Sequence, residues 1–293
     1  MKIAGRLADD RYARITCVSP LVGVLTLVAI TVVWGSTFAI VKEALEVLPV
    51  PLLLAIRFTL AALALAWVRF DPRAWRPALI LGLLAFAGFA TQTIGLSLTT
   101  ASKAAFITGL NVILTPIIGS WWFRNRIPPK AYLAALVALA GLGLLTLTSM
   151  DGINSGDLWI LATAVFYAYY VVYLGEVAGR ASALSLSAVQ LWPMAALAWL
   201  WALPHLSLIP DIPVATWGAL AYLAVAATAI ATVAQTYAQR VVPAYAAAVI
   251  FVLEPVFAAF FAYLWLGESL SLLGWLGGLL VLLAMLLSGL RRW

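Results

Sequence analysis

Two ionisable residues, Arg57 and Glu254, lie inside long apolar stretches of the sequence. A charge at the centre of a bilayer costs about 2.5–3.5 kcal/mol on insertion scales, so such residues usually pair or mark a path for substrates and ions. Glu254 has two interpretations: it couples protons or binds a substrate amine, or it is a structural carboxylate beside Pro255. Arg57 lies nearer one end of its stretch, where its long stem could carry the guanidinium to the interface. The sequence leaves open whether Arg57 and Glu254 pair.

Three prolines lie in the middle of apolar segments: Pro116, Pro193 and Pro255. A proline inside a helix removes one backbone hydrogen bond and leaves a carbonyl without its partner. Lipid cannot satisfy that carbonyl, so broken helices at membrane depth line protein or a water-filled cavity. Thr115-Pro116 and Glu254-Pro255 occupy matching places in the two halves of the chain, a pattern that points to the substrate site of a transporter. We predict helix breaks at all three prolines, with the first and last flanking that site.

Aromatic side chains gather in the segment 156–177. They are Phe166, Tyr167, Tyr169, Tyr170 and Tyr173, and their spacing places an aromatic face on one helix. Tyrosine hydroxyls at mid-depth need polar partners, which lipid does not offer. Tyr167, Tyr170, Trp34 and Trp192 are therefore candidate walls of a cavity that accepts a ring or a cation. The alternative for each of these residues is ordinary packing in the core.

Neutral polar residues occur at the same depth. Gln92 and Asn111 are the best further cavity candidates, because they belong to the two neighbouring segments of which the second contains Pro116. The remaining ones are Thr108, Thr115, Gln190 and Gln235. The alternative role for all of them is hydrogen bonding between helices, which contributes only about 0.6–2 kcal/mol for each bond.

The composition places these residues in a membrane protein. The chain has 293 residues, of which 65% are hydrophobic and 10% are charged, whereas a soluble domain carries about 25% charged residues. One crossing of a bilayer needs about 20 apolar residues. The sequence predicts membrane spans at 21–43, 51–69, 77–98, 102–123, 130–149, 156–177, 182–203, 213–238, 243–266 and 271–290.

The distribution of lysine and arginine predicts the orientation. Ten spans put both termini on one side, and positive residues favour the cytoplasm. That side carries Lys2, Arg6, Arg11, Arg14, Arg69, Arg73, Arg76, Arg124, Arg126, Lys130, Arg180, Arg240, Arg291 and Arg292, and the other side only Lys42 and Lys103. The net charge of +6 is therefore a topology signal and not a sign of nucleic-acid binding. We expect a bacterial-type inner (plasma) membrane, with the tail 1–20 in the cytoplasm.

The chain also contains an internal repeat. Residues 101–105 resemble residues 243–247, and Thr115-Pro116 resembles Glu254-Pro255. The predicted repeats are 21–149 and 156–290, with five spans each. Because five is odd, the second repeat enters the membrane upside down, as in many transporters. The predicted fold is all-α, with ten transmembrane helices as two inverted five-helix repeats around a central cavity.

Short motifs add to this pattern: W-G-S-T-F at 34–38, R-F at 57–58, E-P at 254–255, L-G-E-S-L at 266–270 and glycines at 274, 277 and 278. Through them the chain resembles the drug/metabolite transporter superfamily with two EamA-type repeats. The resemblance implies cytoplasmic termini and movement of small metabolites, often export. In length and midplane aromatics the chain is similar to the YddG-type amino-acid exporters. Pro128-Pro129 stands where the first repeat would have Gly-Glu, which favours a local turn or capping role for Glu268.

We expect a secondary or facilitative transporter that exports small metabolites, above all amino acids including aromatic ones, by alternating access. The alternatives are an exporter of lipophilic or organic cations, a nucleotide-sugar carrier, a membrane-embedded enzyme, and a membrane scaffold or sensor. Single residues of histidine (His205) and cysteine (Cys17) provide neither a metal cluster nor a nucleophile with its base. No catalytic residue, metal or cofactor is therefore expected, and proton coupling stays open. The expected partners are a small-molecule substrate and the lipid bilayer. The sequence leaves the oligomeric state open and is compatible with a monomer.

Overall fold

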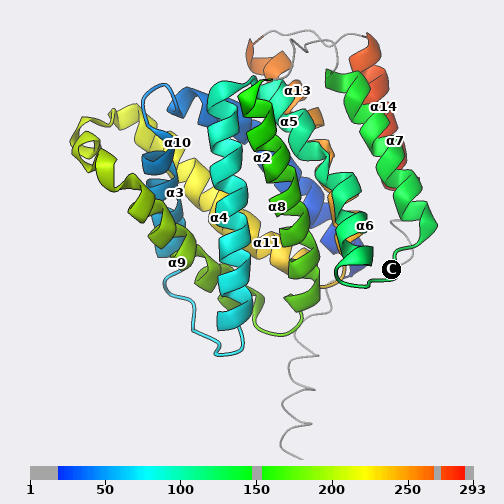
Figure 1. Cartoon of the computed structure of the whole chain (residues 1–293), viewed down its shortest axis with the longest axis horizontal. Coiled ribbons are helices and arrows are strands. Elements are labelled where there is room, and N and C mark those ends of the chain that lie inside the picture. The colour runs from blue at the N-terminus through cyan, green and yellow to red at the C-terminus, as the bar shows by residue number, and fades with distance from the viewer. Residues whose placement is uncertain (1–18, 147–153, 267–271, 288–293) are drawn as a thin grey trace, which may run out of the picture.

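The computed structural model of the chain describes residues 19–146, 154–266 and 272–287. Figure 1 shows them as helices packed side by side in one bundle. Cys17 and Glu268, about which the sequence raised expectations, lie outside the described residues.

The helices follow the predicted spans. The first half contains α2 (Pro20–Ala44), α3 (Val50–Ala64), α4 (Trp75–Leu98), α5 (Ala101–Gly109), α6 (Asn111–Trp121) and α7 (Pro129–Thr146). The second half contains α8 (Ser155–Val177), α9 (Ala183–Ala202), the 3₁₀ segment η2 (Leu203–Asp211), α10 (Val214–Ala224), the π-helical segment η3 (Val225–Ile230), α11 (Ala231–Ala238), α12 (Ala244–Phe251), α13 (Leu253–Leu266) and α14 (Leu272–Leu287).

Within the described residues, seven helical stretches are long and apolar enough to cross a membrane, and three shorter apolar helices, Val50–Ala64, Pro129–Leu144 and Leu272–Ala284, complete ten. The predicted all-α, ten-span fold is thereby confirmed. Polar side chains set several helix starts, because they accept the backbone N–H groups that the first turn leaves free. Ser19, Thr100, Asn154 and Ser182 act in this way for α2, α5, α8 and α9.

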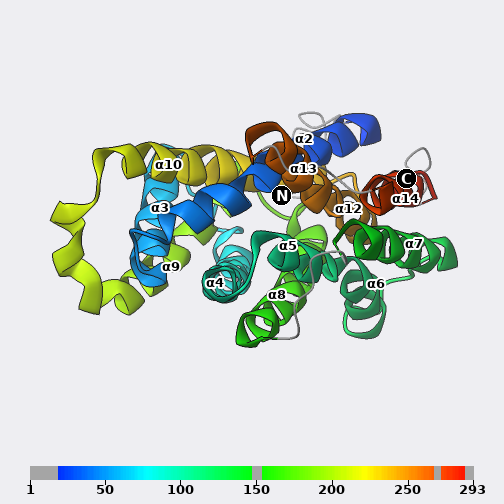
Figure 2. The ribbon, with the colours of Figure 1, turned by 90° about the horizontal axis from the view of Figure 1, so that it is seen from above.

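The two halves run in opposite directions. Figure 1 shows α2 beginning and α14 ending at the same end of the bundle, and α8 beginning at the opposite end. We name these the inner and the outer end after the orientation that the lysine and arginine bias predicts. The largest helix contacts, α7 with α14, α4 with α8 and α3 with α9, each join one half to the other. The halves therefore interleave, and Figure 2 shows this arrangement from above.

Two spans are broken, and both breaks precede a proline. Leu110 separates α5 from α6, upstream of Pro116, and Val252 separates α12 from α13, upstream of Pro255. A proline disturbs the turn before it, because its ring crowds the carbonyl of that turn and offers no N–H to it. Helix α6 continues through Pro116, so the break predicted at this residue is wrong and the interruption lies six residues upstream of it. Pro255 instead lies in the first turn of α13, three residues after the interruption at Val252.

The break predicted at Pro193 is wrong, because α9 continues through this residue. A neighbouring helix covers the backbone here: a Cβ built on Gly82 of α4 would lie 2.6 Å from the Gln190 carbonyl oxygen and 2.7 Å from Pro193 Cγ. Membrane helices tolerate proline where a neighbour encloses the disturbed turn. The predicted span at 213–238 is present as Val214–Ala238, and η3 adds a π-helical turn within it.

Helices α2 and α13 approach closely at Gly35. A Cβ at this position would lie 2.9 Å from the Glu254 carbonyl oxygen and 2.8 Å from Phe257 Cβ. Because helix backbone cannot move aside easily, Gly35→Ala is expected to push the helices apart and to destabilise the protein by about 1–3 kcal/mol. The measurement is the thermal unfolding midpoint in detergent. Gly218→Ala, with nothing within 4 Å, is the matched control, and equal midpoints for the two variants would contradict the close contact.

Candidate functional site

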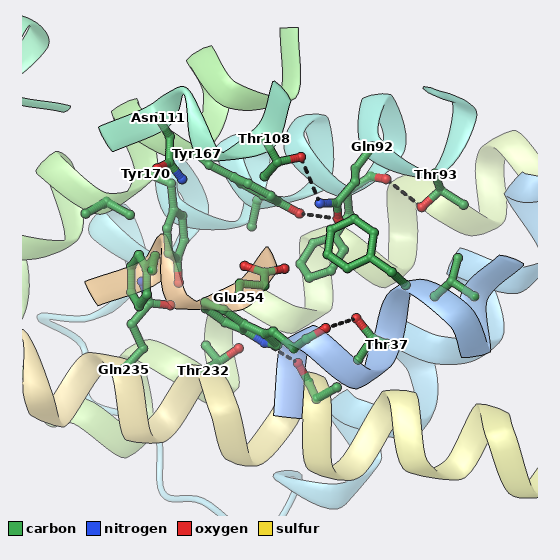
Figure 3. A pocket seen from close by; sticks show the side chains of 18 of the residues that line it. Thr37, Gln92, Thr93, Thr108, Asn111, Tyr167, Tyr170, Thr232, Gln235 and Glu254 are labelled. Atoms are coloured by element: carbon green, nitrogen blue, oxygen red, sulfur yellow. Dashed lines mark hydrogen bonds between the residues drawn. The ribbon is translucent and has the colours of Figure 1, made fainter. Parts of the chain in front are cut away.

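A cavity lies between the two halves, with a volume of about 80 Å³. One water needs about 10–15 Å³ on the same measure, so the cavity has room for several waters. Figure 3 shows its labelled polar side chains converging from opposite sides. Six of the predicted substrate-site residues line it: Trp34, Gln92, Asn111, Tyr167, Tyr170 and Glu254. Arg57, predicted only as an intramembrane charge, lines it as well.

Glu254 brings a carboxylate to the cavity from the first turn of α13, directly after the break at Val252. The N-terminus of a helix carries a partial positive charge, which favours an acidic side chain at this position. In Figure 3 the carboxylate points into the space between Tyr167 and Thr37. In the described part of the chain it has neither a hydrogen bond nor an ion pair, so it is available to a ligand.

Arg57 is buried, with 3% of its surface exposed. Its Nε donates a hydrogen bond of 2.8 Å to Thr228 Oγ1, and its Cζ lies 4.6 Å from the centre of the Phe89 ring. The guanidinium therefore does not reach the membrane interface, and the snorkelling interpretation is wrong. Among the described residues it forms no ion pair with Glu254, and its two terminal nitrogens make no hydrogen bond.

The π-helical segment η3 supplies partners to two cavity residues. Thr228 accepts from Arg57 and donates to the Leu223 carbonyl, and the Ala227 carbonyl accepts from Trp34 Nε1 at 3.0 Å. A π-helical turn displaces the backbone relative to an α-helix, and such turns are frequent at functional sites. Neither Ala227 nor Thr228 stood out in the sequence, because a π-turn has no simple residue signature.

The tyrosines of α8 divide into two groups. Tyr167 donates to Gln92 Oε1 and Tyr170 donates to Gln190 Oε1, each at 3.1 Å, so both hydroxyls lie on the cavity side. Tyr169 instead packs edge-on against Trp122, and Tyr173 contacts Phe123. The predicted aromatic face thus serves the cavity with two tyrosines, while two others pack against the residues that end α6 and follow it.

Two buried polar atoms at the cavity have no hydrogen-bond partner among the described residues: Asn111 Oδ1 and Gln190 Nε2. Leaving such atoms unpaired costs free energy, so their presence beside a cavity indicates that water or a polar solute satisfies them. The described residues contain no cluster of His, Cys, Asp and Glu side chains that could hold a metal ion. The cavity therefore brings a positively charged group, a negatively charged group and aromatic side chains together in a space with room for water.

Most of the sequence matches a known protein family. A family model described as the EamA-like transporter family matches this chain twice, over residues 21–147 and 154–290. The chain belongs to the EamA-like transporter family. It is accordingly a multi-pass membrane protein of a transporter family, as the sequence motifs suggested.

Relatives of this EamA-like transporter agree. It is 32% identical to an uncharacterized transporter of Archaeoglobus fulgidus, over 91% of this chain and 85% of that protein. It is 28% identical to an uncharacterized transporter of Synechocystis sp., over 92% of this chain and 90% of that protein. A crystal structure of another protein shares the fold, with a TM-score of 0.76 and 20% identity over 92% of this chain and 99% of that one.

Trp192 is the one predicted substrate-site residue that the structure does not bring to the cavity of this EamA-like transporter. Its side chain is 49% exposed and lines a separate surface pocket with Leu65 and Trp75. The spacing along α9 explains this, because residues two apart on a helix do not share a face. Gln190 faces the cavity, so Trp192 points away from it. The position of Gln190 was the signal in the sequence that could have excluded Trp192.

Proposed function

We propose that this EamA-like transporter moves small zwitterionic metabolites, in the first place amino acids including aromatic ones. One observation carries the proposal: Arg57 and Glu254 line the same cavity and form no ion pair with each other. An amino acid carries a carboxylate and an ammonium group, which are complementary to a guanidinium and a carboxylate. Trp34, Tyr167 and Phe89 add the aromatic surface that a ring can contact.

The proposed mechanism is alternating access by a secondary or facilitative route. The inverted halves can pack in two alternative ways, which open the cavity first to one side and then to the other. The breaks at Leu110 and Val252 lie beside the cavity residues Asn111 and Glu254, where a small rotation of the half-helices changes the lining. We further propose a bacterial inner membrane with both termini in the cytoplasm, from the lysine and arginine bias.

The test is transport by the purified full chain in liposomes. Vesicles preloaded with unlabelled tyrosine or phenylalanine should take up the labelled amino acid by exchange, saturably and faster than vesicles without protein. A membrane-permeant organic cation and a nucleotide-sugar serve as rival labelled substrates. Uptake of a rival substrate, together with no exchange of any amino acid, would overturn the proposal.

Export of organic cations is a second candidate, because a carboxylate without a partner and aromatic rings attract a cation. Glu254 and Trp34 provide these two elements. Arg57 in the same cavity opposes this candidate, since a second positive charge there would be repelled. Competition decides between the two: a tyrosine carrier should be inhibited by phenylalanine and little affected by an amine that lacks the carboxylate.

Two tryptophans provide a matched pair of variants. Trp34→Phe removes the indole that donates to the Ala227 carbonyl and forms part of the cavity wall. The smaller ring would offer the substrate less aromatic surface and is no longer held to η3, and since an aromatic contact contributes about 0.5–1.5 kcal/mol, we expect the apparent affinity to fall about fivefold. Trp192→Phe, on the outer surface of α9, should leave transport kinetics unchanged. Initial rates over a range of substrate concentrations give the apparent affinity of each variant. Equal affinities for Trp34→Phe and Trp192→Phe would show that Trp34 does not contact the substrate.

A further inference from the structure

A second cavity lies at the inner end of the bundle, between α6, α8 and the turn that joins α11 to α12. It has a volume of about 410 Å³ and includes Thr115, Glu176, Gln239 and Tyr245 in its lining. Its walls come from both halves, as those of the central cavity do. The proposed function assigns no role to this inner cavity.

Three helices carry residues of both cavities in succession. Along α6, Asn111 lines the central cavity and Thr115 lines the inner one. At the end of α11, Gln235 and Gln239 repeat this pattern, and on α8 Val171 is followed by Val172. A helix rises about 1.5 Å per residue. The partition between the cavities is therefore only about one helical turn thick, roughly 6 Å.

The partition is polar and can be opened by side-chain movement. Gln235 Nε2 donates to Gln239 Oε1 at 3.0 Å, and Gln239 Nε2 donates to the Val171 carbonyl at 2.8 Å. Both bonds are neutral, so water or a polar solute can replace them at small cost. Gln239 directly follows the last residue of α11, and Gly23 of α2 packs against Val241 and Val242 in the turn before α12 begins at Ala244. Opening of the partition therefore depends on the Gln239 side chain and not on movement of this packed turn.

Two polar atoms beside the partition have no hydrogen-bond partner among the described residues. They are Asn111 Oδ1 on the central side and Thr115 Oγ1 on the inner side, with 6% and 1% of the residues exposed. Buried polar atoms are rarely left unpaired in native structures, where protein or ordered water satisfies them. Unsatisfied atoms on both sides of one thin partition point to a route that polar solutes or water occupy.

The outer end has a different arrangement at the corresponding place. The internal repeat relates the start of α5 to the start of α12, and at the start of α5 Lys103 Nζ lies 2.8 Å from Asp157 Oδ2. Both side chains are almost fully buried, and Asp157 also accepts from Thr99 Oγ1 at 2.8 Å. A buried ion pair with an added hydrogen bond holds its segments together, because separating the charges would leave each of them unpaired. The outer end is therefore tied by a buried ion pair across α4, α5 and α8. The inner end is hollow, and hydrogen bonds from Arg240 to the Ala178 and Ala181 carbonyls hold the rim of its cavity.

We propose that the inner cavity is the vestibule through which small polar or zwitterionic solutes pass to and from the central cavity, and that Gln239 is the gate between the two. This inference rests on the proposed function for the solute that passes, but the route itself can be tested without that solute. The state described has its outer end tied by the Lys103–Asp157 pair and its inner vestibule formed. The side chain of Gln239 separates the vestibule from the substrate groups.

Thiol labelling tests the route. Cys17 is the single cysteine of the chain and precedes α2. Its labelling by a membrane-impermeant reagent therefore shows on which side of the vesicle membrane the inner end of the bundle lies. In the Cys17→Ser background, Thr115→Cys should react from that side, and Asn111→Cys should react from it slowly. Adding Gln239→Ala or Gln239→Met, which remove both hydrogen bonds, should speed the labelling of Asn111→Cys about tenfold.

Thr236→Val is the matched control. Thr236 also belongs to α11 and is buried, but its hydroxyl contacts Ser187 at 3.1 Å, away from the partition. It should leave the labelling rate unchanged, so that a general loosening of α11 is excluded. Labelling of Asn111→Cys from the opposite side alone, or an unchanged rate with both Gln239 variants, would overturn the inference. Failure of amino-acid exchange with the expected labelling pattern would instead count against the proposed substrate.

Discussion

Glu254→Gln is expected to lower amino-acid exchange by about tenfold or more at low substrate concentration. The substrate ammonium would lose a charged acceptor, and hydrogen bonds to charged groups contribute about 1.5–3 kcal/mol, of which each 1.4 kcal/mol is a factor of ten in affinity. Glutamine keeps the shape of the side chain, and the carboxylate has no protein partner to lose in the described part of the chain. Initial exchange rates in liposomes measure the effect.

Glu43→Gln is the matched control, because Glu43 is an exposed carboxylate near the outer end of α2. It should exchange like the natural chain. Wild-type affinity in Glu254→Gln, with the same amount of folded protein by size-exclusion chromatography, would show that Glu254 does not contact the substrate.

The same variant separates the two functional interpretations of Glu254. A carboxylate that carries the coupled proton makes accumulation depend on a pH gradient, whereas one that only binds the amine does not. Accumulation driven by such a gradient should disappear in Glu254→Gln if the residue carries the proton. The measurement is uptake with and without an imposed gradient, and an unchanged dependence on it would end the coupling hypothesis.

Arg57→Met is expected to change which substrates are accepted. The variant removes the guanidinium that would hold the substrate carboxylate, so exchange of tyrosine should fall at least tenfold. Exchange of tyramine, which has the amine and the ring but no carboxylate, should be retained or improved, because the repelling charge is gone. The ratio of the two initial rates measures the effect independently of the amount of protein.

The control for Arg57→Met is Arg57→Lys together with the exposed Arg76→Lys. Lysine retains the charge but cannot both bond Thr228 through Nε and stack its plane on Phe89. Arg57→Lys should therefore lie between the natural chain and Arg57→Met in its preference for tyrosine, while Arg76→Lys should not change it. A parallel loss of tyrosine and tyramine exchange in Arg57→Met would indicate a purely structural role for this residue.

The proposed transport cycle assigns substrate selection and access to the cavity to different residues. Arg57 and Glu254 would select the substrate by its two charges, and Gln239 would control passage to the inner side. The Lys103–Asp157 pair lies at the other end of the bundle, where it ties α5 to α8. In this arrangement selection and access depend on different residues, so the variants of one set should leave the readout of the other unchanged.

Much of the site could be predicted from residue type and depth. Glu254, Gln92, Asn111, Tyr167, Tyr170 and Trp34 were chosen because polar and charged groups at mid-membrane need partners, and all six line the cavity. Trp192 was chosen by the same reasoning and lies outside it. Depth is therefore readable from sequence, whereas the face of the helix is readable only relative to a neighbour whose direction is known, as that of Trp192 is relative to Gln190.

The sequence by itself determined that the chain is surrounded by lipid, that it has ten spans, and that its two halves run in opposite directions. Lipid acts on each segment separately, through its apolar length and its charges, so these features need no knowledge of neighbouring helices. Tertiary structure alone decided that Arg57 turns inward to Thr228, which is 171 positions away in the chain. It also decided that Pro193 leaves α9 intact beside Gly82, and that a π-turn carries Thr228. These outcomes depend on packing between distant segments, which determines where a buried polar group finds its partner.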